Sequence, residues 1–273
     1  MPMLTPLLQP HPHGVRLALS DAMAAPPDGL PRKEKLEAAL AALTARLEEL
    51  QAALGAEARR ALLVVLQGRD ASGKDGTIRR VFSGLNPALC SVTSFKRPST
   101  LELQHDYLWR VHQALPPRGS IGLFNRSHYE DVIAVRVHGL AAEAVWRKRF
   151  DHINAFERML CDEGVVIRKF FLHISKEEQR ERLEERLSNP AKNWKFQESD
   201  LAERTKWEDY SAAYEEVLER CSTEYAPWYV VPADRNKPRD FLVAEVLVRT
   251  LELMDPRYPA ANPAVESLRG TIR

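Results

Sequence analysis

The chain has 273 residues, of which 44% are hydrophobic and 28% charged, and its formal net charge is +1. These values are typical of one soluble α/β domain with additions, and they give no overall signal for binding nucleic acid or a membrane. The three cysteines are widely spaced and form no CxxC pair, and no apolar run reaches the roughly 18 residues of a membrane span. We therefore expect a cytoplasmic protein without disulfides, zinc, nucleic acid or a membrane as a partner.

The ends of the chain differ from its centre. Residues 1–32 are rich in proline and lack periodicity, which predicts an extended arm, and residues 256–273 predict a tail for the same reason. Residues 33–58 predict a helix, because leucines recur at alternating spacings of four and three. Such a stripe packs on its own domain or, alternatively, on another subunit, so a homo-oligomer (dimer or tetramer) is an expectation.

Short apolar segments alternate with helical patterns between these ends. The predicted strands are 61–67, 91–95, 120–124, 165–173 and 228–231. The predicted helices are 74–84, 101–114, 142–162, 176–187, 199–221 and 239–254. Strands separated by helices predict a parallel sheet covered on both faces, with ligands bound at the carboxyl ends of the strands.

The first predicted strand leads into a phosphate-binding loop. Gly68 ends the apolar run, Gly73 and Lys74 follow, and a helical pattern begins there. Glycines let backbone N–H groups point at phosphate oxygens, and the lysine adds a positive charge for a terminal phosphate. Asp75 occupies the position where Ser or Thr normally holds Mg²⁺, and Asp70 lies inside the loop. Two carboxylates beside a polyphosphate would repel it unless cations lie between them, so the pattern favours a metal-bridged, kinase-like site.

Polar side chains follow the third predicted strand, in the run from Asn125 to Asp131. Asn125 stands where many phosphate-loop proteins have an aspartate for Mg²⁺, which makes Asp70 the better metal candidate. Arg126 is expected to clamp the transferring phosphoryl group. Glu130 and Asp131 would orient the acceptor or hold a second cation; alternatively, they only favour the start of a helix.

A basic segment follows on the helix predicted over 176–187. Arg182 and Arg186 lie four residues apart and share a helix face, and the chain breaks after them at Pro190. Kinases often close such a segment over phosphates, which predicts a lid at about 182–205. The alternative is a solvated face, because glutamates interleave with the arginines.

Basic residues are concentrated around the loop. Between residues 59 and 136, twelve lysines and arginines stand against six acids, which predicts a polyanionic substrate. Lys96 and Arg97 would guide a long anion, or are surface charge in the alternative interpretation. The predicted phosphate-binding residues are Gly68, Arg69, Ala71, Ser72, Gly73, Lys74, Asp75, Gly76, Arg79, Lys96, Arg97, Arg126 and Arg136.

The sequence resembles the polyphosphate kinase 2 family over roughly residues 33–255. The motifs that carry the resemblance are GRDASGKDG at 68–76, SFKRPS at 94–99, FNRSHYEDV at 124–132 and RLEERLSNPAKNWKF at 182–196. It implies a P-loop kinase fold similar to thymidylate kinase, with three layers, a parallel five-stranded sheet and a helical lid. Asn125 together with Glu130 resembles class III, whose members phosphorylate both AMP and ADP.

The resemblance implies a reversible transfer of the terminal phosphate of inorganic polyphosphate to AMP and ADP, giving ADP and ATP, with Mg²⁺ or, as the alternative ion, Mn²⁺. The expected catalytic residues are Asp70, Lys74, Arg126, Glu130, Arg182 and Arg186. The expected nucleotide-binding residues are Asp70, Asn125, Glu130, Asp131, Arg182, Arg186, Lys192, Asn193 and Trp194, and the metal ligands are Asp70 and Asp131. Two alternatives remain at this point: an ATP-dependent nucleoside-monophosphate kinase and a regulatory module that only binds nucleotide or polyphosphate.

Overall fold

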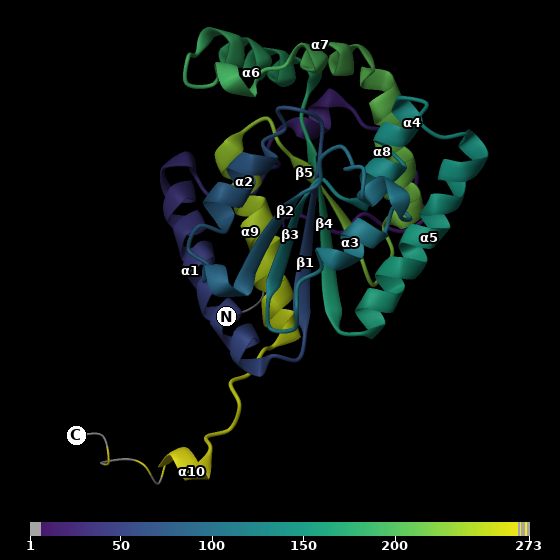
Figure 1. Ribbon diagram of the computed structural model, residues 1–273. Helices are drawn as coiled ribbons and strands as arrows, with labels where there is room; N and C mark the ends of the chain where they lie inside the picture. The colour runs from purple at the N-terminus through teal and green to yellow at the C-terminus, as the bar shows by residue number, and fades with distance from the viewer. Residues whose placement is uncertain (1–6, 267, 269–270, 272–273) are drawn as a thin grey trace.

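A computed structural model describes residues 7–266, 268 and 271, and a parallel five-stranded sheet forms the centre of this part of the chain (Figure 1). The strand order is β2-β3-β1-β4-β5, and every neighbouring pair is parallel. The strands are β1 (Ala61–Gln67), β2 (Cys90–Ser94), β3 (Ile121–Asn125), β4 (Val165–His173) and β5 (Trp228–Pro232). The five predicted strands are therefore confirmed, with bounds within one residue. Residues 1–6, 267, 269–270 and 272–273 of the predicted arm and tail lie outside the described residues.

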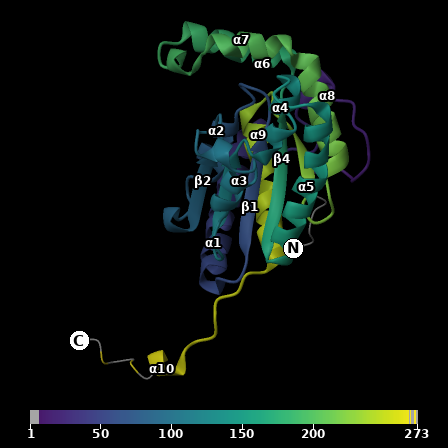
Figure 2. The same ribbon diagram turned by 45° about the vertical axis from the view of Figure 1, so that its right-hand side comes forward.

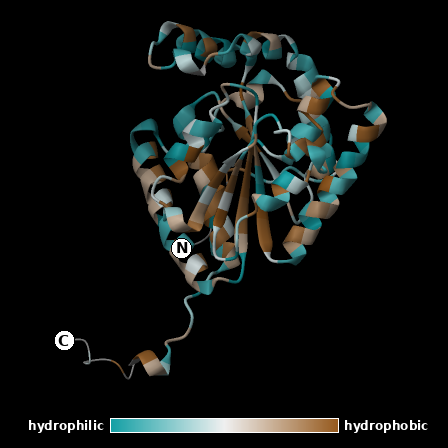
Figure 3. Ribbon diagram, viewed as in Figure 1, coloured by the Kyte–Doolittle hydropathy of each residue, from teal (hydrophilic) through white to brown (hydrophobic). Residues whose placement is uncertain are grey.

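The position of each strand in the sheet explains its sequence. All seven residues of β1 are buried, because β3 and β4 flank it and helices cover both of its faces. A strand covered on both faces needs a continuous apolar run, not an alternating one. The edge strand β2 leaves three of its five residues exposed and is correspondingly polar. Figure 3 shows this concentration of apolar residues in the central strands.

Helices form a layer on each face of the sheet. On one face lie α1 (Lys33–Glu57), α2 (Lys74–Val81) and α9 (Asn236–Met254), and on the other lie α3 (Trp109–Gln113), α4 (Ala134–Val137), α5 (Glu143–Asp162) and α8 (Trp207–Cys221). Two further helices, α6 (Lys176–Ser188) and α7 (Glu198–Thr205), extend across the carboxyl ends of the strands in both ribbon views (Figures 1 and 2). This arrangement confirms the expected three-layer fold and places a helical lid over the loop end of the sheet.

The leucine stripe of α1 packs within its own chain. Leu36, Leu40, Leu47, Leu50 and Leu54 are buried, and they join one apolar core with residues of α9 and β1. The interpretation of the stripe as own-domain packing is confirmed. The stripe therefore gives no support to a subunit contact, and the homo-oligomer stays a prediction.

Two predicted helices are interrupted. The helix expected over 101–114 is a 3₁₀ turn at Glu102–Gln104 followed by α3, because the Asp106 side chain accepts from the Leu108 amide at 2.9 Å and competes with a continuous helix. The helix expected over 199–221 breaks at Lys206 into α7 and α8. Here α8 buries six residues against the core whereas α7 buries none, so the two segments follow different surfaces.

The predicted arm and tail behave differently. The arm lies along β5 and α8, where the His11 amide donates to the Trp228 carbonyl at 2.7 Å and the Gly14 amide to the Glu219 carbonyl at 2.9 Å. The described part of the tail leads away from the sheet and contains the short helix α10 (Pro263–Glu266) (Figure 1). Among the described residues, no helix combines the length and apolarity needed to cross a bilayer.

A buried ion pair joins β4 to α5 beneath the segment that follows β3. Lys169 Nζ donates to Glu157 Oε2 (2.5 Å), to the Tyr129 hydroxyl (2.7 Å) and to the Cys221 carbonyl (2.7 Å). Both charged side chains are fully buried. Burial by itself would raise the pKa of the Glu157 carboxyl, but Lys169 and His128 together lower it. The buried Glu157 carboxylate therefore depends on its neighbours Lys169 and His128.

We expect Lys169→Met to lower the free energy of unfolding by about 3–5 kcal/mol, because it leaves the Glu157 charge buried without its partner. Urea denaturation measures this loss. Lys148→Met is the matched control, since Lys148 is exposed on α5 and has no hydrogen bond or ion pair among the described residues; its change should stay within about 0.5 kcal/mol. Equal losses in the two variants would contradict the prediction.

Candidate phosphate-transfer site

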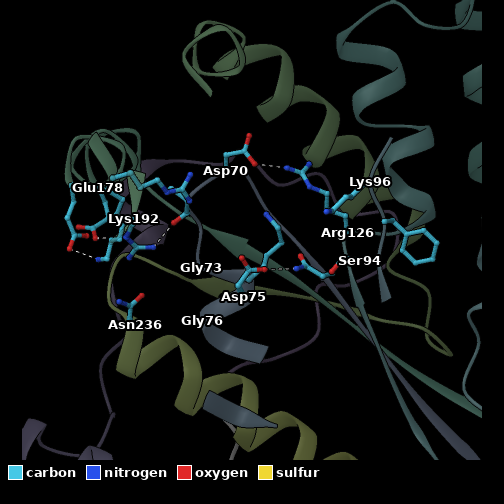
Figure 4. Close-up of a pocket in the computed structure, with 17 residues that line it drawn as sticks. Asp70, Gly73, Asp75, Gly76, Ser94, Lys96, Arg126, Glu178, Lys192 and Asn236 are labelled. Carbon is cyan, nitrogen blue, oxygen red and sulfur yellow. Dashed lines mark hydrogen bonds and ion pairs between the residues drawn. The ribbon is translucent and has the colours of Figure 1, made fainter. Parts of the chain in front are cut away.

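A cavity of about 640 Å³ opens at the carboxyl end of the sheet, between the phosphate loop and α6 (Figure 4). The loop that connects β1 to α2 forms one wall, β2 and β3 contribute their last residues, and α6 with the chain after it forms the opposite wall. The lining residues are Asp70, Ala71, Gly73, Lys74, Asp75, Gly76, Ser94, Phe95, Lys96, Asn125, Arg126, Glu178, Arg182, Glu185, Arg186, Lys192 and Asn236. The cavity therefore unites residues of all four predicted motifs.

The loop needs glycine at position 73. Gly73 has a φ of +99°, a conformation that side-chain-bearing residues rarely adopt. A Cβ atom there would clash with Nη1 of Arg239, a buried residue of α9. Arg239 lies directly beneath the loop, and the sequence analysis missed it. Its one signal was a pair of adjacent charges, Arg239 and Asp240, at the start of a strongly apolar helix.

Lys74 lies buried at the floor of the cavity. Its Nζ donates to the Gly68 carbonyl (2.7 Å) and the Arg69 carbonyl (3.2 Å). Burial, assisted by the positive charge of Arg126, lowers the pKa of Lys74 to about 8. An ammonium group that is desolvated in this way gains strongly from an anion placed in the cavity.

Arg126 connects two carboxylates at the cavity wall. Its Nη2 donates to Asp70 Oδ1 at 2.5 Å, an interaction drawn in Figure 4, and its Nη1 lies 3.5 Å from both oxygens of Glu130. Glu130 and then Asp70 raise the pKa of Arg126. Asp70 and Arg126 line the cavity, whereas Glu130 stands outside its lining as a partner of the guanidinium. The arginine is thus charged and oriented toward the loop.

Asn125 and Asp75 meet across the cavity floor, where Asn125 Nδ2 donates to Asp75 Oδ1 at 2.6 Å. Both residues depart from the usual phosphate-loop pattern, and they do so as a pair. The carboxylate is supplied by the first turn of α2, and the neutral side chain by the end of β3. The carboxylate that many phosphate-loop proteins have at the end of β3 is therefore supplied by α2 in this chain. The cavity floor still carries one carboxylate at this place.

The lid brings further cations to the cavity. Arg186 pairs with Asp200 (3.3 Å) and Lys192 with Glu185 (2.5 Å), and both basic residues line the cavity. Asn193 and Trp194 do not line it, and Trp194 is 76% exposed. Their contact with a nucleotide stays a prediction.

Several predicted site residues have side chains outside the cavity lining. The Arg69 guanidinium lies 4.0 Å from the ring of Trp207 and donates to Ser211, because burial against α8 turns it away from the cavity. Arg136 pairs with Glu216 at 2.7 Å and Asp131 with Arg149 at 3.0 Å, each on the α5 and α8 side of the sheet. Arg79 and Arg97 are exposed and lie outside the lining. Sequence position alone placed these residues near the loop, but their packing partners determine where they point.

Comparison with known proteins identifies relatives that match most of the chain. The sequence model of polyphosphate kinase 2 (PPK2) matches residues 31–259. The AMP/ADP-polyphosphate phosphotransferase of Meiothermus ruber is 56% identical over 230 residues, which cover 84% of this chain and 86% of that protein. The ADP-polyphosphate phosphotransferase of Rhodopseudomonas palustris is 48% identical over 244 residues, covering 85% and 84%. The crystal structure of polyphosphate kinase 2 from Arthrobacter aurescens TC1 has a TM-score of 0.84 at 38% identity, covering 94% of this chain and 98% of that one.

Proposed function

The chain belongs to the polyphosphate kinase 2 family, and from this premise we propose that it transfers the terminal phosphate of inorganic polyphosphate to AMP and to ADP. One observation carries the proposal: the cavity combines a phosphate loop, its lysine and Arg126 with cations from a lid. The relative at 56% identity is named for both acceptors, which supports AMP as well as ADP.

The arrangement suits transfer between two phosphate chains. Lys74 lies at the floor of the cavity and Arg126 at its wall, and Lys96 lines its side and leads to the exposed Arg97. A bond between phosphorus and a bridging oxygen of polyphosphate breaks, and a new one forms to an oxygen of the terminal phosphate of the nucleotide. That acceptor oxygen is already ionised, so alignment and charge neutralisation suffice without a strong general base. One anhydride replaces another, and the reaction should run readily in both directions.

The donor set of the cavity fits Mg²⁺, or Mn²⁺ in its place. Asp70 and Asp75 both offer carboxylate oxygens at the loop, and Mg²⁺ usually takes one or two carboxylates and completes its shell with phosphate oxygens and water. No group of three or more acidic, histidine or cysteine side chains able to hold a metal occurs among the described residues, so the substrate would have to complete the site. Asp131, which pairs with Arg149, does not join these carboxylates. When bound, the ion would neutralise charge on the phosphates.

The direct test mixes purified protein with Mg²⁺, long-chain polyphosphate and AMP, without ATP, and separates the nucleotides by chromatography. We expect ADP to form first and ATP to follow. If ADP is phosphorylated but AMP is not, the donor assignment stands and the AMP assignment falls. Activity only with ATP as donor would favour a conventional nucleoside-monophosphate kinase. Tight binding without turnover would favour a regulatory module.

Binding of a phosphate chain should be accompanied by proton uptake above about pH 8. In the free protein the pKa of Lys74 is lowered to about 8, so at about pH 8.5 most Lys74 side chains are neutral. A bound anion raises this pKa, so Lys74 takes up a proton when the phosphate chain binds. The affinity for the phosphate chain should therefore fall as the pH rises above 8. Below pH 8 the lysine is already charged, and its protonation no longer affects the affinity. Titration calorimetry with tripolyphosphate, in buffers of different ionisation enthalpy, measures the uptake. Lys74→Ala should show none, and equal uptake by the variant would contradict the assignment.

A further inference from the structure

The helix α6 reaches from the lid to the backbone of the phosphate loop. Gln179 Nε2 donates to the Asp70 carbonyl at 3.0 Å, and Arg182 Nη1 donates to the Ala71 carbonyl at 2.9 Å. Both donors lie on the side of α6 that faces the loop, and neither bond involves a loop side chain. The lid helix therefore holds two successive carbonyl groups of the loop.

The helix α9 holds the next carbonyl group from the other side. Arg239 Nη1 donates to the Ser72 carbonyl at 3.3 Å. Arg239 is 1% exposed and is itself fixed by Asp240 (2.7 Å) and Asn236 (2.7 Å). Three consecutive carbonyls, at residues 70, 71 and 72, thus each accept a hydrogen bond from a side chain of a neighbouring helix.

This pattern sets the direction of the loop amides. In a planar trans peptide the C=O and N–H groups point in opposite directions. Holding the carbonyls of Asp70 and Ser72 therefore turns the N–H groups of Ala71 and Gly73 the other way. Both residues line the cavity, and within the described part of the chain neither N–H donates a hydrogen bond. Backbone amides without an acceptor in residues that line a cavity are the donors that an anion requires.

We propose that Gln179, Arg182 and Arg239 are positioning residues that preset the phosphate loop before any phosphate binds. The proposal rests on the proposed function for the identity of the substrate. It changes the role of Arg182, which the sequence analysis assigned to substrate phosphates.

The guanidinium of Arg182 makes four hydrogen bonds within the described part of the chain. Its Nε donates to Glu178 Oε1 (2.8 Å), and its Nη2 to the carbonyls of Ala233 (2.8 Å) and Asp234 (3.0 Å). With Nη1 on the loop, every nitrogen of the group has a partner in the chain. Arg186, one helical turn further along α6, has one hydrogen bond, to Asp200, and lines the cavity. Arg182 therefore anchors the helix to the loop and leaves Arg186 to meet the substrate.

The test compares Arg182→Met and Gln179→Leu with Glu181→Gln. Glu181 is exposed on the same helix and has no hydrogen bond or ion pair among the described residues, so its variant should match the wild type. Two quantities are measured: kcat and KM for AMP with polyphosphate, and hydrogen exchange of the loop in substrate-free protein. The Ser72 amide reports on the loop, because it donates to the Arg69 carbonyl at 3.2 Å.

We expect Arg182→Met to lower kcat about ten- to a hundredfold, with a smaller change in KM, and to speed exchange at Ser72 without substrate. Gln179→Leu should show a smaller loss of kcat and a smaller increase in exchange at Ser72. It provides an independent test of the inference if Arg182→Met folds poorly. Arg182→Lys should restore neither kcat nor the slow exchange at Ser72, because an ammonium group cannot form the several hydrogen bonds that the planar guanidinium makes.

Exchange at Ser72 at the wild-type rate in both the Arg182→Met and Gln179→Leu variants would overturn the inference. If Arg182→Met changes only KM, which rises, Arg182 would be assigned to substrate binding, as the sequence analysis expected. Exchange is measured without substrate, so it is independent of the reaction assigned to the cavity. A wild-type protein that phosphorylates neither AMP nor ADP would overturn the proposed function, and the exchange data would still decide the inference.

Discussion

Lys74→Ala is expected to lower kcat for phosphate transfer at least about a thousandfold while the protein stays folded. Lys74 is the buried cation at the floor of the cavity, where its Nζ lies against the loop carbonyls. A phosphate that enters the loop meets this charge in a poorly hydrated environment, in which an electrostatic contact counts for more than in water. The polyphosphate and AMP assay measures the loss, and Lys148→Ala, on the exposed face of α5, should be as active as the wild type.

The stability of this variant separates the catalytic role from a structural one. The pKa of Lys74 is lowered in the folded protein, to about 8 from an ordinary value of 10.5. The charged lysine is therefore unfavourable to folding below pH 8, and this cost disappears as the pH rises toward the unfolded value. Lys74→Ala should melt within a few degrees of the wild type at neutral pH. Between pH 8 and about 10, the melting temperature of the wild type should rise relative to that of the variant. A folded variant with normal turnover would remove Lys74 from the mechanism.

Asp70→Asn is expected to lower kcat at least about a hundredfold, because it removes the carboxylate charge that we propose for the metal ion. The variant keeps an oxygen that can accept from Arg126, so the cavity wall should survive. Transfer rates at increasing Mg²⁺ and the binding of Mn²⁺, followed by electron paramagnetic resonance with tripolyphosphate present, measure the effect. Asp151→Asn, an exposed position on α5, is the matched control.

The two measurements distinguish the possible roles of Asp70. Weaker Mn²⁺ binding together with slower transfer would support the role of Asp70 as a metal ligand. Slow transfer with unchanged Mn²⁺ binding would instead assign Asp70 to holding Arg126, with which it forms an ion pair at 2.5 Å. Transfer at the wild-type rate would exclude both roles.

The sheet and the loop could be predicted because local sequence determines them. The run ALLVVLQ can lie only where helices cover both faces of a strand, and the spacing of Gly68, Gly73 and Lys74 fixes the turn that follows. The directions of long side chains could not be predicted in this way. Arg182 and Arg186 share a helix face and both line the cavity, yet Arg182 donates to backbone carbonyls whereas Arg186 donates to Asp200. The carbonyls that Arg182 contacts come from distant parts of the chain, so the sequence pattern does not indicate them.

Other differences between the expected and the observed directions of side chains have the same physical cause. Arg69 lies in the loop motif, but the indole of Trp207, distant in sequence, attracts its guanidinium away from the cavity. The sequence did not indicate that Arg239 belongs to the site, because a charged residue at the start of an apolar helix normally faces solvent. Only tertiary packing, which brings α9 beneath Gly73, gives it a function. Motifs therefore locate the site, whereas burial decides which of its charges are available.

The N-terminal arm has a practical consequence for producing the protein. Strand β5 forms one edge of the sheet, and the arm covers it through the bond from the His11 amide to Trp228. Further along the arm, the Ala24 carbonyl accepts from the Asp234 amide at 3.1 Å, two residues after the end of β5. An uncovered edge strand is a template for pairing with other chains. A protein shortened to start at residue 33, where the sequence pattern changes, would expose this edge and be prone to aggregate.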